Sequence, residues 1–394
     1  MMHLRKIGVA GVAVSAAIGL CALLPTGVGA EPSGRMTKAA EANAQKLLQG
    51  GVKFLLSQRE PDGGWSLGKG AFKPAATGLV LKALLQDPAY DRTSPIVKKG
   101  FEVLLGYRQK DGGIYDPKEG VSSYTTAVAI MALAAAHDPQ YKDTIRGAMK
   151  FLADIQVQPG QESPDGKVVS PTDPNIGGVG YGRNGVPNLS VLGFVSEAWH
   201  EAGMKPDDEA MKRTIGFLTR LQNRSESSTM PLAKQGADDG GFPYDYAHSK
   251  AGQTGPEGKG LRSYGTMTYV GFKSMLYAGV AKDDPRVVAA YNWIRRYWRL
   301  DSNPNMPDKR SKEGLYYYYH VFAKALRAWG QDEIPAFKDA KVKHNWRQEL
   351  TAALAERVRG DGSWVNESAP RWDEGNSVLA TCYCVLALEE AMKK

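Results

Sequence analysis

Two kinds of apolar segment alternate along this chain. In the first kind, apolar residues recur at spacings of three and four, and Lys, Arg and Glu fill the positions between them, as in 43–58 and 141–156. This pattern is typical of a helix with one face in water. In the second kind, charges are few and Ala, Gly, Ser and Thr are many, as in 124–136 and 376–392. That composition predicts buried helices that pack closely.

A glycine-rich motif lies between each amphipathic segment and the buried segment that follows it. Its most complete copy is PDGGW at 61–65, and related copies follow at intervals of 48 to 74 residues. Recurrence at such intervals indicates a repeat architecture. The residues that define the motif across its six copies are Gln58, Asp62, Gly63, Gly64, Trp65, Gly112, Gly113, Tyr115, Gly177, Gly178, Gly240, Gly241, Gly314, Gly362 and Trp364.

Six repeats of one amphipathic and one buried helix predict an all-α fold. We expect an (α/α)6 toroid, in which six outer helices surround six inner helices. The glycines permit the left-handed or tight backbone that reverses the chain between the two helices of a repeat. The aromatic residue after the glycines is predicted to pack across adjacent outer helices. We therefore interpret the motif as a structural device rather than a catalytic one.

The first thirty residues have the features of an export signal. Arg5 and Lys6 precede an apolar run at 7–24, and small residues follow it. We predict a signal peptide over 1–30, a tether over 31–37 and a single toroid domain over 38–394. The apolar run is also about as long as a membrane span needs, so an uncleaved anchor is the alternative. The predicted location is exported, periplasmic or extracellular, and membrane contact is expected only if the segment stays uncleaved.

Charge and cysteine content limit the classes of function. Lysine and arginine number 50 against 42 acidic residues, and the excess is spread along the chain. Nucleic-acid binding needs a concentrated basic surface, so we expect no nucleic-acid partner. Cys382 and Cys384 are too close in sequence for an unstrained disulfide, and we expect both to be small buried apolar side chains. We expect the protein to be a monomer.

The stretch GVKFLLSQREPDGGW at 51–65 resembles the repeat of protein prenyltransferase β subunits and squalene cyclases. The resemblance extends over about residues 38–392 and implies the α/α toroid of those proteins. The Asp-x-Asp-Asp motif of the cyclases is missing from the inner-helix starts, and the zinc-binding Asp-x-Cys of the prenyltransferases does not occur. The Cys-Gly-Glu-Gln of complement-like thioester domains is also missing. We therefore expect no metal site and no cofactor.

The starts of the inner helices ring one mouth of such a toroid. Polar and aromatic residues at these starts are therefore predicted to face a central cavity. The cavity candidates are Tyr124, Thr125, Tyr264, Tyr318, His320, Asp373 and Glu374.

His320 is the candidate with the most definite chemical interpretation. Tyr316 lies four residues before it and would share its helix face, and Asp373 or Glu374 of the next repeat could orient its ring as a general base. The alternative is a buried histidine bonded to a neighbouring carbonyl, with the tyrosine run 316–319 filling the seam between repeats. We favour the structural alternative.

Two classes of function remain open. The first is an exported binding or scaffold protein that keeps the toroid without the catalytic residues. The ligand expected in its central cavity is either isoprenoid-like or a polysaccharide. The second is an enzyme: a polysaccharide lyase or glycosidase using Tyr, His and carboxylate groups at the mouth, or, as a further alternative, a divergent terpenoid-processing enzyme. A groove rich in aromatics and arginine would favour a sugar, and a closed apolar pocket would favour an isoprenoid or no ligand.

Long polar loops at 157–174 and 247–260 are predicted to be lids over the mouth or disordered.

Overall fold

The computed structural model describes residues 35–162, 166–183, 185–230, 237–255 and 257–393. The predicted signal peptide at 1–30, and with it the alternative of an uncleaved anchor, lies outside these residues. Within the described residues, none of the helices has the length and the apolar character that crossing a bilayer requires.

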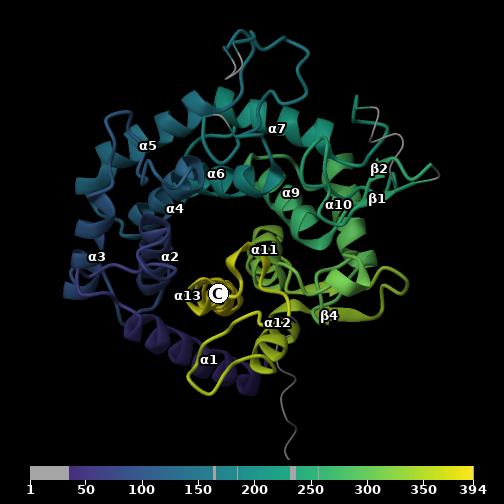
Figure 1. Cartoon of the computed structure of the whole chain (residues 1–394). Helices are drawn as coiled ribbons and strands as arrows, with labels where there is room; N and C mark the ends of the chain where they lie inside the picture. Colours follow the sequence, from purple (N-terminus) through teal and green to yellow (C-terminus); the bar gives the residue numbers. More distant parts are fainter. Residues whose placement is uncertain (1–34, 163–165, 184, 231–236, 256, 394) are drawn as a thin grey trace, which may run out of the picture. The chain divides into compact units, whose positions relative to one another are not determined.

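Twelve α-helices of the described residues form two concentric layers (Figure 1). The outer helices are α1 (Lys38–Ser57), α3 (Pro95–Leu105), α5 (Lys142–Ile155), α7 (Glu209–Leu221), α10 (Pro285–Arg296) and α12 (Trp346–Ala355). The inner helices are α2 (Lys73–Gln86), α4 (Ser122–Ala135), α6 (Leu189–Glu201), α9 (Gly265–Tyr277), α11 (Leu315–Trp329) and α13 (Ser377–Met392). Each outer helix leads into an inner helix, which confirms the predicted (α/α)6 toroid.

The inner helices close into a ring. Each inner helix packs on the next in chain order, from α2 through α4, α6, α9 and α11 to α13, and α13 packs back on α2. The outer helix α1 contacts both α12 and α13, so the first repeat completes the ring with the last (Figure 1). All six inner-helix starts therefore meet around one axis.

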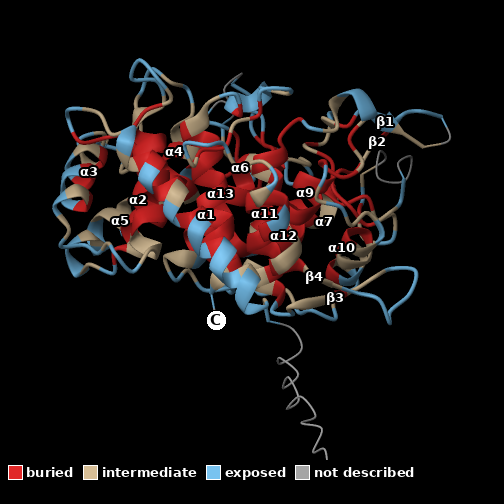
Figure 2. Cartoon of the chain, turned by 90° about the horizontal axis from the view of Figure 1, so that it is seen from below, coloured by how far each residue is buried: buried red, intermediate tan, exposed pale blue. Residues whose placement is uncertain are grey.

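Burial follows the two patterns of apolar residues. The inner helix α13 is buried without interruption from Val378 to Ala391. The outer helix α7 buries positions 210, 211, 214, 217, 218 and 221, which lie on one helix face. Figure 2 shows the same contrast, with inner helices almost wholly buried and an exposed stripe along α1. Small residues bring the inner helices together, since a Cβ atom at Gly193 would lie 2.3 Å from the side chain of Val270.

The glycine motif turns the chain and also packs on the next repeat. The first glycine of the motif has a positive φ, for example +85° at Gly177 and +86° at Gly362. A Cβ atom at Gly177 would lie 1.9 Å from the carbonyl oxygen of Arg213 in α7, and one at Gly362 would lie 2.6 Å from that of Gly50 in α1. The turn therefore needs glycine both for its backbone angle and for its close approach to the neighbouring outer helix.

The tryptophan of the motif ties its own repeat together. The Trp65 indole donates a hydrogen bond to the Leu55 carbonyl of α1 at 2.7 Å, and the Trp65 backbone N–H donates to Thr77 of α2 at 3.0 Å. Trp364 makes the same two bonds in the last repeat. The ring of Trp65 also lies against Gly100 in the next outer helix, α3. One buried side chain thus contacts three helices.

Two short antiparallel hairpins add to the helical layers, where the sequence indicated no strands. In one, β1 (Gln253–Thr254) pairs with β2 (Gly260–Leu261); in the other, β3 (Glu333–Pro335) pairs with β4 (Lys343–Asn345). Part of the predicted loop 247–260 therefore has regular structure.

Replacing Gly177 with alanine tests the packing of the motif. We expect the free energy of unfolding to fall by more than about 2 kcal/mol, because the positive φ and the clash with Arg213 both have to be relieved. Denaturant unfolding measures this loss. Gly203→Ala is the matched control, since Gly203 has a φ of +82° but no atom within 4 Å of an added Cβ. The free energy of unfolding of Gly203→Ala should fall by about 1 kcal/mol. Equal losses in the two variants would contradict the packing role of Gly177.

Candidate functional site

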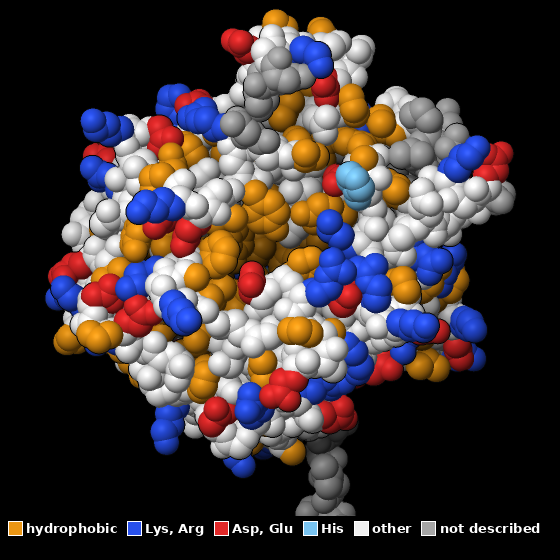
Figure 3. Space-filling model, in the orientation of Figure 1, with side chains coloured by type: hydrophobic (Ala, Val, Ile, Leu, Met, Phe, Trp, Pro, Cys, Tyr) orange, Lys and Arg blue, Asp and Glu red, His pale blue; other side chains and the backbone are white. Residues whose placement is uncertain are grey.

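A cavity of about 380 Å³ opens at the centre of the ring, where the inner helices begin. Figure 3 shows it as a hollow lined mostly by hydrophobic side chains. The aromatic residues of its lining are Phe72, Tyr124, Tyr181, Phe194, Tyr244, Tyr264, Tyr317, Trp372 and Tyr383. The polar and charged residues of its lining are Ser190, Lys250, Thr266, Asp373 and Glu374.

Aromatic rings form a continuous wall across four inner helices. Tyr124 of α4 meets Phe194 of α6 edge to face, with ring centroids 4.8 Å apart. Phe194 stacks on Tyr317 of α11 at 5.6 Å, and Tyr317 contacts Tyr383 of α13 at 5.5 Å. Burial raises the pKa of Tyr317 and of Tyr383 well above the ordinary value, so both phenols stay neutral. Such a wall can bury an apolar chain, and its ring faces attract cations.

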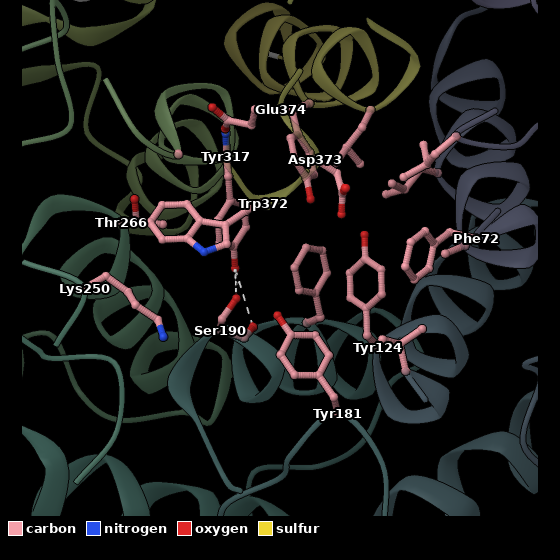
Figure 4. Close-up of a pocket in the computed structure, with 18 of the residues that line it drawn as sticks. Phe72, Tyr124, Tyr181, Ser190, Lys250, Thr266, Tyr317, Trp372, Asp373 and Glu374 are labelled. Carbon is pink, nitrogen blue, oxygen red and sulfur yellow. Dashed lines mark hydrogen bonds between the residues drawn. The ribbon is translucent and has the colours of Figure 1, made fainter. Parts of the chain in front are cut away.

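Trp372 and Asp373, which precede α13, bring an unusual backbone to the mouth. Their φ angles are +56° and +61°, so two consecutive residues other than glycine are left-handed. In Figure 4 the Asp373 carboxylate points into the cavity toward Tyr124. Trp372 is 41% exposed, and its ring lies against Gly314 at the start of α11. Strain of this kind concentrates at functional sites, which makes this segment a candidate.

Glu374 holds the same segment to the neighbouring repeat. It is only 1% exposed, and its carboxylate accepts hydrogen bonds from the Tyr317 N–H at 2.7 Å and the Asn366 side-chain amide at 2.8 Å. The first bond satisfies an N–H in the first turn of α11, which has no side-chain cap of its own. Burial raises the pKa of Glu374 to about 7, and these hydrogen bonds act in the opposite direction. Glu374 therefore caps a helix across repeats.

Buried ion pairs lie one turn further along the inner helices. Lys82 of α2, Lys273 of α9 and Lys324 of α11 surround Glu197 of α6, with N–O distances of 3.2, 2.5 and 3.0 Å. Lys324 also pairs with Glu390 of α13 at 3.0 Å. Burial alone would raise the pKa of Glu197, but the three lysines hold it well below its ordinary value. Losing one partner would leave a buried charge unpaired, which is costly. The network therefore holds the inner helices together beneath the cavity.

His320 lies between the aromatic wall and the ion pairs. It is 2% exposed, and its ring stacks on Tyr383 at 5.5 Å and Phe194 at 6.4 Å. Burial lowers the pKa of His320 to about 3, although Glu197 acts to raise it, so the ring is neutral. Its Nδ1 has no hydrogen-bond partner among the described residues, and it does not line the cavity. Among the described residues, His320 Nδ1 is bonded neither to Asp373 nor to Glu374, the two predicted orienting partners, and the Glu374 oxygens are engaged elsewhere.

Three more predicted residues lie outside the cavity lining. The Tyr318 hydroxyl donates to the Arg299 carbonyl at 2.8 Å, while Tyr316 and Thr125 are buried away from the mouth. The tyrosine of this run that reaches the cavity is Tyr317, because a helix turns each successive side chain by about 100°. The predicted residues that do line the cavity are Tyr124, Tyr264, Asp373 and Glu374.

Sequence reasoning missed two features of this site. Tyr181 and Tyr244 follow the glycines of the third and fourth motif copies. The aromatic residue at this place in the motif is expected to pack across adjacent outer helices, but both tyrosines line the cavity. The buried ion pairs were also missed, although a signal existed. Lys82, Lys273 and Lys324 each lie within an otherwise apolar inner segment, where an unpaired charge would be costly.

The described residues contain no group of three or more His, Cys, Asp or Glu side chains placed to hold a metal ion. Cys382 and Cys384 are free thiols, both buried in α13.

The structure resembles known terpene cyclases. It matches a variant of the type II terpene cyclase MstE from Scytonema, in complex with its substrate geranylgeranyl dihydroxybenzoate, with a TM-score of 0.55 at 16% identity over 91% of this chain and 99% of that chain. It matches a protein from Actinoplanes with a TM-score of 0.51 at 17% identity over 89% of this chain and 100% of that chain. At these identities the likeness shows the fold alone, which is the α/α toroid of the terpene cyclases.

Sequence likeness to a curated protein is more limited. The drimenyl diphosphate synthase of Streptomyces showdoensis is 27% identical over 173 residues, which are 43% of this chain and 30% of that protein. The match thus spans less than a third of the length of that relative. No protein-family model matches the chain.

The raised pKa of Glu374 gives stability a defined pH dependence. The folded state holds this proton up to a pH of about 7, whereas an ordinary glutamate releases it near 4.5. The contribution of protonated Glu374 to the free energy of unfolding is therefore complete below pH 4.5 and is lost as the pH rises through 7. Relative to Glu374→Gln, we expect the free energy of unfolding of the wild type to fall by up to roughly 3 kcal/mol between pH 4.5 and 8, at about 1.36 kcal/mol per pKa unit.

Denaturant unfolding at several pH values measures this difference. Taking the difference between the two proteins removes other titrating groups, including His320, whose lowered pKa favours the folded state at higher pH. Glu41→Gln, at an exposed position in the first turn of α1, is the control and should run parallel to the wild type. If the free energy of unfolding of Glu374→Gln changed with pH in parallel with that of the wild type, Glu374 would not be held protonated in the folded state.

Proposed function

We propose that this protein binds an isoprenoid chain in its central cavity and is a terpenoid-related protein. The observation that carries the proposal is the cavity itself, which has about 380 Å³ of space and mostly aromatic and aliphatic walls. Small-molecule sites have volumes of about 300 to 1,000 Å³. An isoprenoid is a branched apolar chain, and its burial against such walls removes apolar surface from water.

The lining favours an isoprenoid over a polysaccharide. It contains no arginine among the described residues, and His320 lies outside it. A uronate lyase needs a group that neutralises the carboxylate and a base that moves the proton. The cavity provides a single lysine for the first task and only neutral phenols beside two carboxyl groups for the second. The shape also fits, because the cavity lies inside the ring rather than along a groove (Figure 3).

The comparisons add support from outside the cavity. The toroid matches a terpene cyclase that has been seen with a geranylgeranyl substrate, and part of the chain is similar to a drimenyl diphosphate synthase. The apolar run at 7–24 supports an exported location as part of the proposal, which fractionation of expressing cells would test.

Binding of geranylgeraniol tests the proposal directly. We expect saturable one-to-one binding by calorimetry, and a loss of affinity of more than about tenfold in Ser190→Trp, because the indole would fill space that the ligand needs. Ser190 is half-buried in the lining; its hydroxyl donates to the Tyr317 hydroxyl at 3.4 Å, and its carbonyl accepts from that hydroxyl at 3.5 Å (Figure 4). Ser57→Trp, on the exposed end of α1, is the matched control and should bind normally. Binding of a polyuronate with release of unsaturated ends, and none of geranylgeraniol, would contradict the proposal.

Asp373 favours a second candidate function, which is cyclisation initiated by a proton. Its carboxyl group faces the cavity beside Tyr124 (Figure 4). In its acid form it can donate a proton to a terminal C=C bond, whose electron pair forms the new C–H bond and leaves a tertiary carbocation. Ring faces stabilise such a cation, and an internal C=C bond can attack it to close a ring. Loss of a proton to the carboxylate then restores a double bond, so the product is an isomer of the substrate.

Incubation with geranylgeraniol followed by mass spectrometry tests this chemistry. We expect a product of unchanged mass with one ring in place of one double bond, and we expect Asp373→Asn to abolish it without changing geranylgeraniol binding by more than about twofold. Asp143→Asn, at an 87% exposed side chain, is the control. Recovery of unchanged substrate from the wild type would leave binding as the function, and product formation by Asp373→Asn would remove Asp373 from the role.

A further inference from the structure

The mouth of the cavity contains a lysine without a carboxylate partner. Lys250 lines the cavity, and its Nζ lies 4.1 Å from the ring centroid of Tyr244. None of the ion pairs between described residues includes it. The nearest acid in sequence, Asp245, is engaged with its own loop, because its carboxylate accepts the backbone N–H groups of Ala247 and His248 at 2.8 and 2.7 Å.

Two other basic residues near the mouth have carboxylate partners. Lys73 lies 2.5 Å from Glu60 and 2.7 Å from Asp62. Arg371 lies 3.5 Å from Glu313, which also pairs with Arg310. Lys250 differs from these residues, since it keeps its charge available toward the cavity.

The loop fixes where Lys250 can reach. The neighbouring Ser249 hydroxyl donates to the Arg262 carbonyl at 2.6 Å, and Ala251 on the other side is buried. In Figure 4 the Lys250 side chain extends toward Ser190 from one side of the cavity, and Asp373 approaches from another. Among the described residues that line the cavity, Lys250 is the one basic residue, and Asp373 is a carboxylate that belongs to none of the ion pairs between described residues.

This arrangement limits the charge of a ligand head group. A diphosphate carries at least two negative charges. Lys250 can pair with one of them, and the others would be repelled by the Asp373 carboxylate because the lining has no second cation. A carboxylate carries one charge and two acceptor oxygens, which match a single ammonium group. A neutral alcohol would leave the ammonium group without a charged partner.

We propose that the ligand is an isoprenoid acid, whose single carboxylate binds Lys250 while its tail occupies the aromatic cavity. This inference rests on the proposed function for the tail and adds the chemistry of the head. Lys250 is accordingly a specificity-determining residue.

Calorimetry at pH 7.5 with three ligands of one tail tests the inference: farnesoic acid, farnesol and farnesyl diphosphate. We expect farnesoic acid to bind about tenfold more tightly than farnesol, which corresponds to about 1.4 kcal/mol. We expect farnesyl diphosphate to bind no more tightly than farnesoic acid. Tighter binding of the diphosphate, or equal binding of acid and alcohol, would overturn the inference.

Two variants assign the preference to one side chain. Lys250→Gln should reduce the affinity for farnesoic acid to that for farnesol and leave farnesol unchanged. Lys259→Gln is the matched control, because Lys259 is a neighbouring exposed lysine that pairs with Glu257 at 2.8 Å and does not line the cavity. A preference for the acid that persists in Lys250→Gln would overturn the assignment.

Oleic acid separates this inference from the proposed function. It has the same carboxylate on an unbranched tail. If farnesol and farnesoic acid both bind without a preference, the cavity takes isoprenoids and only the head-group inference fails. If oleic acid binds in a manner that depends on Lys250 and no farnesyl compound binds, the proposed isoprenoid function fails and the carboxylate site stands.

Discussion

The close approach of four glycine turns, at Gly112, Gly177, Gly240 and Gly362, to the backbone of the next outer helix is the constraint on which the rest of this structure depends. At Gly177 and Gly362 a side chain would overlap a carbonyl group of the neighbouring repeat. The same contact recurs at Gly112 and Gly240, and at Gly362 it brings the last turn against α1, where the ring closes. Closure then forces six inner-helix starts onto one axis, and the cavity is the space that these starts leave between them.

Polar groups divide the interior of the ring into two zones. Toward the mouth, aromatic rings line the cavity, and the available charges are those of Lys250 and Asp373. Further along the same helices, Glu197 and the three lysines around it fill the axis with paired charge. An apolar chain entering from the mouth would therefore stop at the layer of Phe194 and His320, since passing it would disrupt buried ion pairs.

The relation to terpene cyclases is one of architecture, with a different set of acids at the cavity. The chain lacks the Asp-x-Asp-Asp motif, and its acidic pair Asp373 and Glu374 comes from the start of the last inner helix. The two carboxyl groups have separate surroundings. Glu374 is consumed in capping α11, and the left-handed backbone at Asp373 aims the other carboxyl group at the rings. Glu374 thus anchors the segment from which Asp373 faces the cavity.

The sequence by itself determined the architecture, because helical periodicity and the glycine motif are local signals that recur in every repeat. It also placed Tyr124, Tyr264, Asp373 and Glu374 at the mouth, since position at an inner-helix start is a local property. Only the tertiary structure decided which side chain of a helix start faces the axis, and so selected Tyr317 over Tyr316 and Tyr318. It also decided the partners of His320 and Lys324, because charges and rings from different repeats meet only when the ring closes.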